Sequence, residues 1–255
     1  NKELANRIGL EKTQILSPKG ELMKKLVVFC PTVDAEKVRT AIFEAGAGHI
    51  GEYDCCAFQL EGEGSFRAGD SANPHVGKKG EIHLEKELRI ETVVPKHMES
   101  QVVQAMIAAH PYEEVAYDLF DLAMPWNSVG SGMWGELPKA MPPTDFLSLL
   151  KEKLNVPCIR HTNLHKDQIK RVAICGGSGS FLLNAAKAVK ADVLVTADFK
   201  YHQFFDAEDD IIIADVGHYE SEQYTPHLLC RYMEEKFDEL ECRITKVNTN
   251  PVKYF

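Results

Sequence analysis

The sequence predicts an α/β protein in which a ferredoxin-like βαββαβ domain is inserted into an α/β core. Short apolar segments at 171–175, 192–196 and 211–215 have the length of buried strands, and segments with helical spacing lie between them. Such alternation is typical of a largely parallel sheet covered by helices. The second observation is the order of elements within residues 24–122, which follows the ferredoxin-like pattern.

Residues 24–122 are expected to fold as a unit of four strands and two helices. Prolines at 31 and 95 end two of the strands, and both helices repeat apolar residues at helical spacing. Between the second and third strands, a polar stretch with Gly69, Pro74, Gly77 and Gly80 is expected to be a long loop or hairpin tip. The expected strands are 25–30, 53–60, 88–94 and 114–120, and the expected helices are 35–45 and 99–109.

The other residues are expected to form the core, with 1–23 as the end of its N-terminal half and 123–255 as its C-terminal half. The first ten residues have the spacing of a helix that ends at Gly9. Leu122 to Pro143 is rich in glycine and proline and is expected to be a connector. Further helices are expected at 145–154, 181–190 and 221–237, and an edge strand at 243–247.

Within the expected connector, Gly130 to Gly135 spells the motif G-x-G-x-x-G. A dinucleotide site needs that motif between a strand and a helix. No clear strand precedes it here, and Pro138 and Pro142 follow where a helix would have to run. A connector loop is therefore the better interpretation.

Charge and cysteine content limit the classes of function. The 255-residue chain has a net charge of -9, which argues against a broad positive face for nucleic acid. Its seven cysteines form no C-x-x-C pair, so reduced thiols in a cytoplasmic protein are expected. No apolar run reaches the ~18 residues that would suggest a membrane span.

The main candidate site is the segment Gly217 to Glu222. His218 and Glu222 are four residues apart where a loop enters a helix, so both side chains can lie on one face and bind a metal ion. Imidazole and carboxylate suit Zn, Fe, Mn or Ni. The alternative is a surface helix start, where the dipole favours Glu220 and Glu222. Spacing alone leaves both interpretations open and favours the second.

Three segments that follow predicted strands are expected to meet at one edge of the sheet and shape a pocket. The segments are 176–179, 196–202 and 217–222. The glycines of the first could hold an anion with backbone N–H groups, or could simply form a tight turn. The second offers an aspartate and a histidine near His218. The expected pocket residues are Gly176, Gly177, Ser178, Gly179, Thr196, Asp198 and His202.

Three other histidines have less specific surroundings. His161 and His165 are also four apart, but the segment is polar and precedes a strand, so solvated loop histidines are expected. His110 follows a predicted helix and is expected to cap its C-terminus, with ligand binding as the alternative.

Several separate motifs resemble those of the NIF-three-like family, whose members are often labelled GTP cyclohydrolase type two homologues. The ferredoxin-like unit resembles the insert of the longer bacterial members, which is similar to PII and CutA regulatory proteins. The resemblance covers essentially the whole chain. The motifs include Arg171–Gly179, Val193–His202, Gly217–Glu222, the closing Asn248–Pro251 and, in the insert, His110–Asp118.

This resemblance implies a hexameric, ring-like shell with a two-metal centre that faces an internal cavity. It places His218 and Glu222 among the metal ligands and implies that the others come from a paired-histidine motif and an aspartate in the N-terminal half of the core. This sequence contains neither motif. The chain is therefore expected to begin inside a larger protein.

The function expected from these observations is that of a cytoplasmic, metal-dependent hydrolase, in which two divalent ions (Zn, Fe, Mn or Ni) activate a water molecule. The family label suggests GTP, but no base-reading motif supports it, so the small-molecule substrate stays open. The alternative is a non-catalytic regulatory or scaffold protein whose insert binds a small ligand or gates a central cavity. Neither a membrane nor a nucleic acid is expected as a partner.

Overall fold

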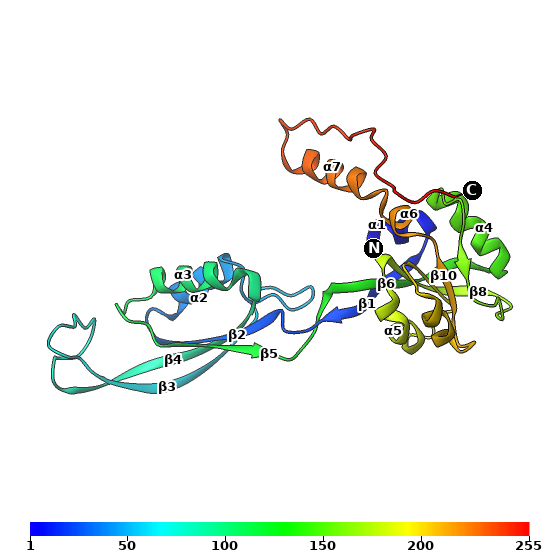
Figure 1. Cartoon of the computed structure of the whole chain (residues 1–255). Helices are drawn as coiled ribbons and strands as arrows, with labels where there is room; N and C mark the ends of the chain where they lie inside the picture. The colour runs from blue at the N-terminus through cyan, green and yellow to red at the C-terminus, as the bar shows by residue number, and fades with distance from the viewer. Residues whose placement is uncertain (255) are drawn as a thin grey trace. The chain divides into compact units, whose positions relative to one another are not determined.

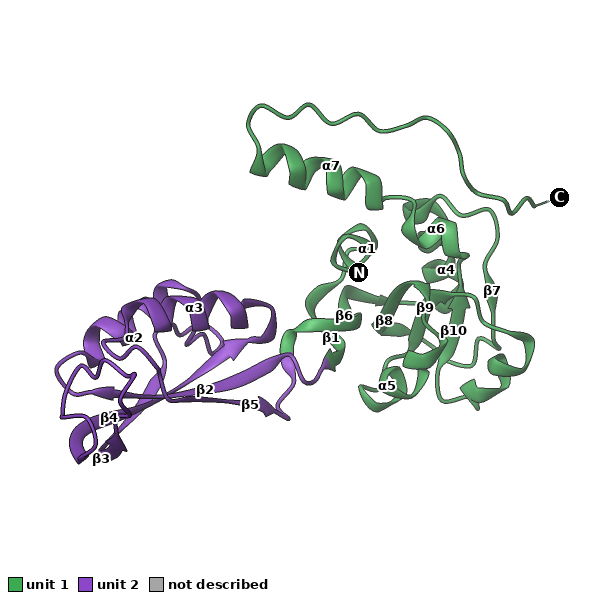
Figure 2. Cartoon of the chain, turned by 60° about the vertical axis from the view of Figure 1, so that its left-hand side comes forward, with its two compact units in different colours: residues 1–18, 127–255 green, residues 19–126 purple. Residues whose placement is uncertain are grey.

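The computed structural model describes residues 1–254, which divide into two compact units. The first unit, the core, consists of residues 1–18 and 127–255, and the second, the insert, of residues 19–126 (Figure 2). The predicted insert, 24–122, was narrower at both ends. Strand β1 ends at Lys19 and strand β6 begins at Trp126, so the insert between them extends beyond both predicted bounds.

The core contains a six-stranded sheet in the order β1-β6-β8-β9-β10-β7. Its three central strands are parallel, as predicted: Val172 pairs with Val193, which in turn pairs with Ile212. The flanking pairs β6–β8 and β7–β10 are antiparallel, so the sheet is mixed. The strands are β1 (Glu11–Lys19), β6 (Trp126–Met141), β7 (Arg160–His161), β8 (Ile169–Ser178), β9 (Val193–Ala197) and β10 (Ile212–Asp215).

Both faces of this sheet are covered because side chains alternate along the central strands. Val172 and Ile174 of β8 belong to one buried cluster with residues of helices α1 and α4. Ala173 and Cys175 belong to a second cluster with residues of α5. The helices are α1 (Lys2–Ile8), which ends at Gly9 as predicted, α4 (Pro143–Leu154) and α5 (Leu183–Ala188), with 3-10 turns η2 (Ser180–Leu182) and η3 (Tyr201–Ala207).

The expected connector at 122–143 is wrong, because most of it is the long strand β6. A Cβ atom on Gly130 would collide with the carbonyl oxygen of Ser17, and one on Gly135 would lie 2.8 Å from that of Glu11. Both oxygens belong to β1, the neighbour of β6 in the sheet. These glycines therefore allow close approach of two backbones, and the same glycines hid the strand from pattern analysis.

The insert has the ferredoxin-like architecture that the sequence predicts. Its four antiparallel strands are ordered β3-β4-β2-β5, and helices α2 and α3 bury one face around Leu26, Ile42, Ile90 and Met106. The helix α3 has the predicted bounds. The elements are β2 (Met23–Pro31), α2 (Ala35–Glu44), β3 (Ala57–Arg67), β4 (Ile82–Pro95), η1 (Lys96–Met98), α3 (Glu99–Ala109) and β5 (Tyr117–Leu122).

The hairpin of the insert is longer than predicted, and β3 and β5 begin later. Strand β3 was expected at 53–60, but it starts at Ala57 and continues to Arg67, which pairs with Ile82 of β4 (Figure 1). Most of β3 is exposed, so it lacks the hydrophobic alternation by which a half-buried strand is recognised. The polar loop is therefore shorter than expected.

The C-terminal region differs from the prediction in two ways. The expected helix 221–237 is two helices, α6 (His218–Glu222) and α7 (Thr225–Lys236). Pro226 lies in the first turn of α7 and has no N–H to donate to Glu222, which explains the break. The expected edge strand 243–247 is absent, since residues 241–254 have no regular secondary structure. In Figure 1 they form an extended segment that returns past α6.

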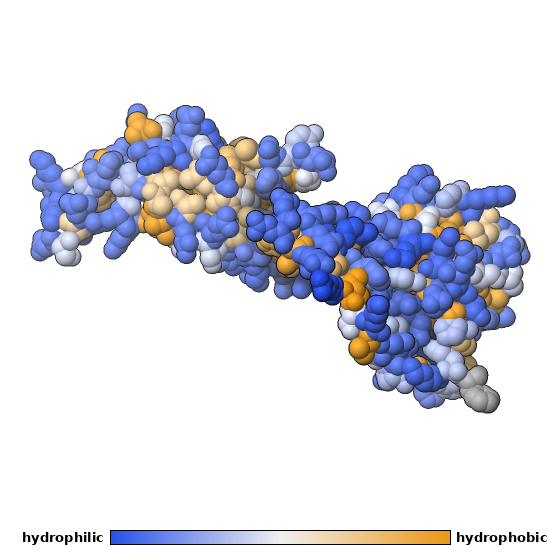
Figure 3. Space-filling model, turned by 90° about the horizontal axis from the view of Figure 1, so that it is seen from above, coloured by the Kyte–Doolittle hydropathy of each residue, from blue (hydrophilic) through white to orange (hydrophobic). Residues whose placement is uncertain are grey.

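The surface is mostly hydrophilic in the view of Figure 3. Helix α7 buries none of its residues, and Leu229, Tyr232 and Met233 on it are exposed. Within residues 1–254, no helix combines the length and the apolar character needed to cross a membrane.

Candidate functional site

The ends of β8, β9 and β10 bring the three predicted segments together, as expected for a parallel sheet. The backbone N–H of Gly177 donates to Ser221 Oγ at 2.8 Å, and the Thr196 hydroxyl donates to the Gly177 carbonyl at 3.0 Å. Ser221 belongs to α6, so the end of β8 is bonded both to the end of β9 and to the helix that carries His218.

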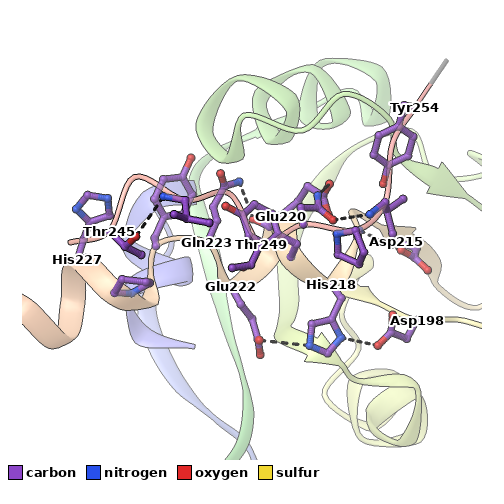
Figure 4. Close-up of a pocket in the computed structure, with 18 of the residues that line it drawn as sticks. Asp198, Asp215, His218, Glu220, Glu222, Gln223, His227, Thr245, Thr249 and Tyr254 are labelled. Atoms are coloured by element: carbon purple, nitrogen blue, oxygen red, sulfur yellow. Dashed lines mark hydrogen bonds and ion pairs between the residues drawn. The ribbon is translucent and has the colours of Figure 1, made fainter.

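His218 lies between two carboxylates at this edge (Figure 4). Its Nδ1 is 2.6 Å from Asp198 Oδ2, and its Nε2 is 3.3 Å from Glu222 Oε2. All three side chains are about half exposed, with relative accessibilities of 53, 47 and 48%. The histidine is therefore accessible to an ion or small molecule from solvent.

The two carboxylates set the proton occupancy of His218. The hydrogen bond to Asp198 is the largest cause that raises its pKa above the usual 6.5, and the charges of Asp198 and Glu222 act in the same direction. When Nδ1–H donates to Asp198, the lone pair of Nε2 is directed to the side of Glu222. A metal ion there would replace the second proton of the imidazolium.

A glycine is required beside this pair. Gly177 has a φ of 66°, in the left-handed region, and a Cβ atom on it would lie 2.7 Å from Glu222 Oε1 and 3.2 Å from His218 Cε1. Any side chain at this position would fill the space next to both predicted ligands.

Buried Asp215 holds the segments that carry Asp198 and His218. Its Oδ2 accepts the backbone N–H of Phe199 at 3.0 Å and bonds to Arg160, and its Oδ1 accepts the N–H of Gly217 at 3.1 Å. Phe199 directly follows Asp198, and Gly217 directly precedes His218. No sequence pattern predicts this role, because the only local signal is an aspartate at the end of a predicted strand.

A pocket of about 900 Å³ extends from His218 along the C-terminal segment. Glu220 is only 5% exposed, and its Oε1 accepts a hydrogen bond from Asn250 Nδ2 at 3.0 Å. Glu220 thus points away from Glu222, as helical spacing predicts, and ties the C-terminal segment to α6. Other lining residues include Asp198, Thr245, Thr249 and Tyr254, which are labelled in Figure 4. Arg160 and Tyr219 also line the pocket.

The remaining predicted pocket residues have different surroundings. Gly176, Gly177 and Ser178 are the last residues of β8 and not part of a turn, and Gly179 precedes the short η2. His202 lies in η3, where its ring packs against Tyr201 at 5.1 Å, and it is not among the residues that line the pocket.

The three other histidines singled out in the sequence, His110, His161 and His165, lie outside this pocket. His161 lies in the edge strand β7, and His165 Nδ1 is 3.2 Å from the carbonyl oxygen of Asn163. His110 follows α3, as predicted, but its ring bonds to Phe29 and Tyr112 and not to the last carbonyl groups of the helix.

The donor set at His218 fits one part of a metal centre. In a tetrahedral site with bonds of about 2.0–2.3 Å, two ligand atoms lie roughly 3.3–3.8 Å apart. The 3.3 Å between His218 Nε2 and Glu222 Oε2 agrees with that spacing. Among residues 1–254, no third His, Cys, Asp or Glu completes a compact ligand group with this pair. Two protein ligands alone hold a metal ion weakly.

Comparison with known proteins gives concordant similarities. The model of the family Duf34/NIF3 (NGG1p interacting factor 3) matches residues 1–251. A Bacillus subtilis (strain 168) protein named "GTP cyclohydrolase 1 type 2 homolog" is 39% identical over 260 residues, covering 100% of this chain and 69% of that protein. A Mycobacterium tuberculosis protein of the same name is 37% identical over 225 residues, covering 86% of this chain and 59% of its own length.

The solved structure of a Bacillus cereus protein related to NIF3 is similar over the whole chain. Its TM-score is 0.85 at 36% sequence identity, and the match covers 100% of this chain and 69% of that one.

Proposed function

The chain belongs to the Duf34/NIF3 family, and on that premise we propose that His218 and Glu222 bind a divalent metal ion in a metal-dependent hydrolase. The observation that carries this proposal is the placement of His218 between Asp198 and Glu222, with Nε2 and Oε2 at the separation of two ligands to one ion. A simple helix start would not require an aspartate on the opposite ring nitrogen.

Each residue of the site has a distinct part in this proposal. His218 and Glu222 would hold the ion, and Asp198 would accept the Nδ1 proton and so keep Nε2 directed at it. Gly177 leaves the space beside both ligands open. When bound, the metal would supply an activated water molecule and polarise the bond to be cleaved.

The rest of the metal centre would come from groups that residues 1–254 do not place beside His218. The family resemblance suggests a paired-histidine motif and an aspartate, and a centre of two ions (Zn, Fe, Mn or Ni) in a homohexamer. Nitrogen and oxygen ligands are compatible with each of these metals.

The substrate would be a small molecule that enters the pocket beside α6. The names of the relatives suggest GTP, and Arg160 at the pocket wall could contact an anionic group. The seven cysteines are all free thiols, which fits the reducing cytoplasm.

The proposal is tested by metal content and activity of the protein expressed from its complete gene. Elemental analysis should find bound metal in the wild type and in His202→Ala, the matched control from the neighbouring turn η3. His218→Ala and Glu222→Gln should each lose metal and, in a hydrolase panel that includes GTP, activity.

Absence of stoichiometric metal from the wild type would refute the metal proposal. Metal without hydrolysis of any substrate would instead favour a regulatory or scaffold protein. The insert supports that second candidate, since it has a complete hydrophobic core of its own.

A further inference from the structure

A second group of potential metal ligands lies at the end of α7, apart from His218. Cys230 and Glu234 are one helical turn apart on α7, so their side chains lie on the same face. After the helix the chain turns, with the Leu240 N–H donating to the Phe237 carbonyl at 3.0 Å. This turn brings Cys242 back to that face.

The three side chains converge on a small volume. The Cys230 Sγ is 3.8 Å from Glu234 Oε1, and the same oxygen accepts the backbone N–H of Cys242 at 3.2 Å. One ligand atom from each residue lies within 4.8 Å of those of the other two. Within residues 1–254, no other three His, Cys, Asp or Glu side chains come this close to one another.

Charges around the group favour a cation. The thiol of Cys230 lies beside the Glu234 carboxylate and the thiol of Cys242. The two cations adjacent in sequence are already paired, Arg231 with Glu3 at 3.1 Å and Arg243 with Glu241 at 3.2 Å. A divalent ion would offset the negative charge that two thiolates and a carboxylate would otherwise bring together.

We propose that Cys230, Glu234 and Cys242 form a zinc site that fastens the C-terminal segment to α7. Two thiolates select Zn²⁺ over Mg²⁺ or Ca²⁺, and the carboxylate supplies the third protein ligand. Binding forms two Zn–S bonds and one Zn–O bond, and the two thiol protons pass to solvent. A water molecule completes the tetrahedron.

The position of this zinc site gives it a role in the pocket described above. Cys242 lies two residues before Ile244, where the C-terminal segment begins to line the pocket. Residues 241–254 have no ladder of strand hydrogen bonds to fix them. The zinc ion would hold the start of that segment on α7, while Asn250 holds a later point on Glu220.

The test uses the 255-residue chain, reduced and freed of metal, in the His218→Ala/Glu222→Gln background that lacks the other candidate site. Titration with Zn²⁺ against a chromophoric chelator should give one ion per chain, and Co²⁺ in its place should give a thiolate-to-cobalt charge-transfer band. The matched control Cys55→Ser/Cys158→Ser, which changes two exposed cysteines elsewhere, should bind equally well.

Cys230→Ser/Cys242→Ser should weaken Zn²⁺ binding by more than roughly 100-fold and remove the band, since altering even a neighbour of a ligand costs about 10–100-fold. Glu234→Gln should weaken binding less and keep the band. The proposal is overturned if the thiolate band is absent, or if the double serine variant binds zinc as the parent does. A mass two hydrogens lower after reduction would show a disulfide there instead, with the same conclusion.

Discussion

His110 in the insert and His218 in the core look alike in sequence but occupy opposite environments. Each follows or begins a helix, and each has a glutamate four residues later, Glu114 or Glu222. Pro111 ends the helical path after His110, so Glu114 is not brought beside the ring. No proline interrupts α6, and Glu222 lies 3.3 Å from the ring of His218.

The partners of the two rings differ in the same way. His110 is 7% exposed, its Nε2 is 2.9 Å from the Phe29 carbonyl oxygen, and its Nδ1 accepts the N–H of Tyr112 at 3.1 Å. Backbone groups thus satisfy a neutral ring, whereas carboxylates surround His218. The hydrogen-bond partners of the ring, more than the H-x-x-x-E spacing, therefore separate a structural histidine from a candidate ligand.

Removal of each imidazole ring should have different consequences for stability. His110→Ala leaves the Phe29 carbonyl and the Tyr112 N–H without their partner, so we expect the insert to lose about 1–3 kcal/mol of unfolding free energy. His218→Ala should change the stability of metal-free protein by no more than about 0.5 kcal/mol. Urea denaturation with hydrogen exchange resolved by unit measures both. Equal effects would contradict the comparison, and His110→Gln, which keeps a donor for Phe29, should recover part of the loss.

A second test concerns the carboxylate that is specific to His218. Asp198→Asn keeps the size of the side chain but loses the charge that fixes the ring, so we expect metal affinity to fall roughly 10–100-fold. Asp206→Asn, in the turn η3 that follows, is the control and should leave affinity unchanged. Isothermal titration with Mn²⁺, which the thiolates of Cys230 and Cys242 do not favour, measures the change on the protein from the complete gene. Unaltered affinity in Asp198→Asn would remove Asp198 from the site.

The smallest expected effect is a dependence of stability on pH. Burial is the largest cause that lowers the pKa of His110, so the folded insert disfavours a proton that the unfolded chain accepts near pH 6.5. Stability of the insert should therefore fall as pH decreases below about 6.5, by at most about 1.4 kcal/mol per pH unit. Urea midpoints between pH 7.5 and 5, compared with those of His110→Gln, check this. If the pH dependence of stability persists in His110→Gln, a titratable group other than His110 causes it.

Much of the fold follows from the sequence because the decisive signals are local. The bounds of α3, the parallel strands β8 to β10 and the βαββαβ order all rest on periodicity and stop signals, and the family suggested by the motifs is confirmed. Strand β6 was missed because its glycines are explained only by β1, more than 100 residues away in sequence. The exposed β3 was misplaced because neither of its faces is consistently apolar.

The candidate site was predictable only in its outline. The helical spacing of His218 and Glu222 and the convergence of strand ends could be read from sequence. Asp198, which pairs with Nδ1 of His218, has a left-handed backbone with a φ of 61°. The contact between Glu220 and Asn250 joins residues thirty positions apart. No local pattern specifies either contact. Whether His218 and Glu222 hold a metal stays a prediction.

Asp215 has a consequence for how this site could vary. One carboxylate anchors the backbone next to Asp198 and the backbone next to His218, so the ring and the group that orients it are positioned from a single point. If Asp215 moves, Asp198 and His218 move together with it, so the geometry between these two side chains is preserved. The edge of the sheet can therefore adapt to changes elsewhere in the core while the histidine keeps the same orientation relative to its aspartate.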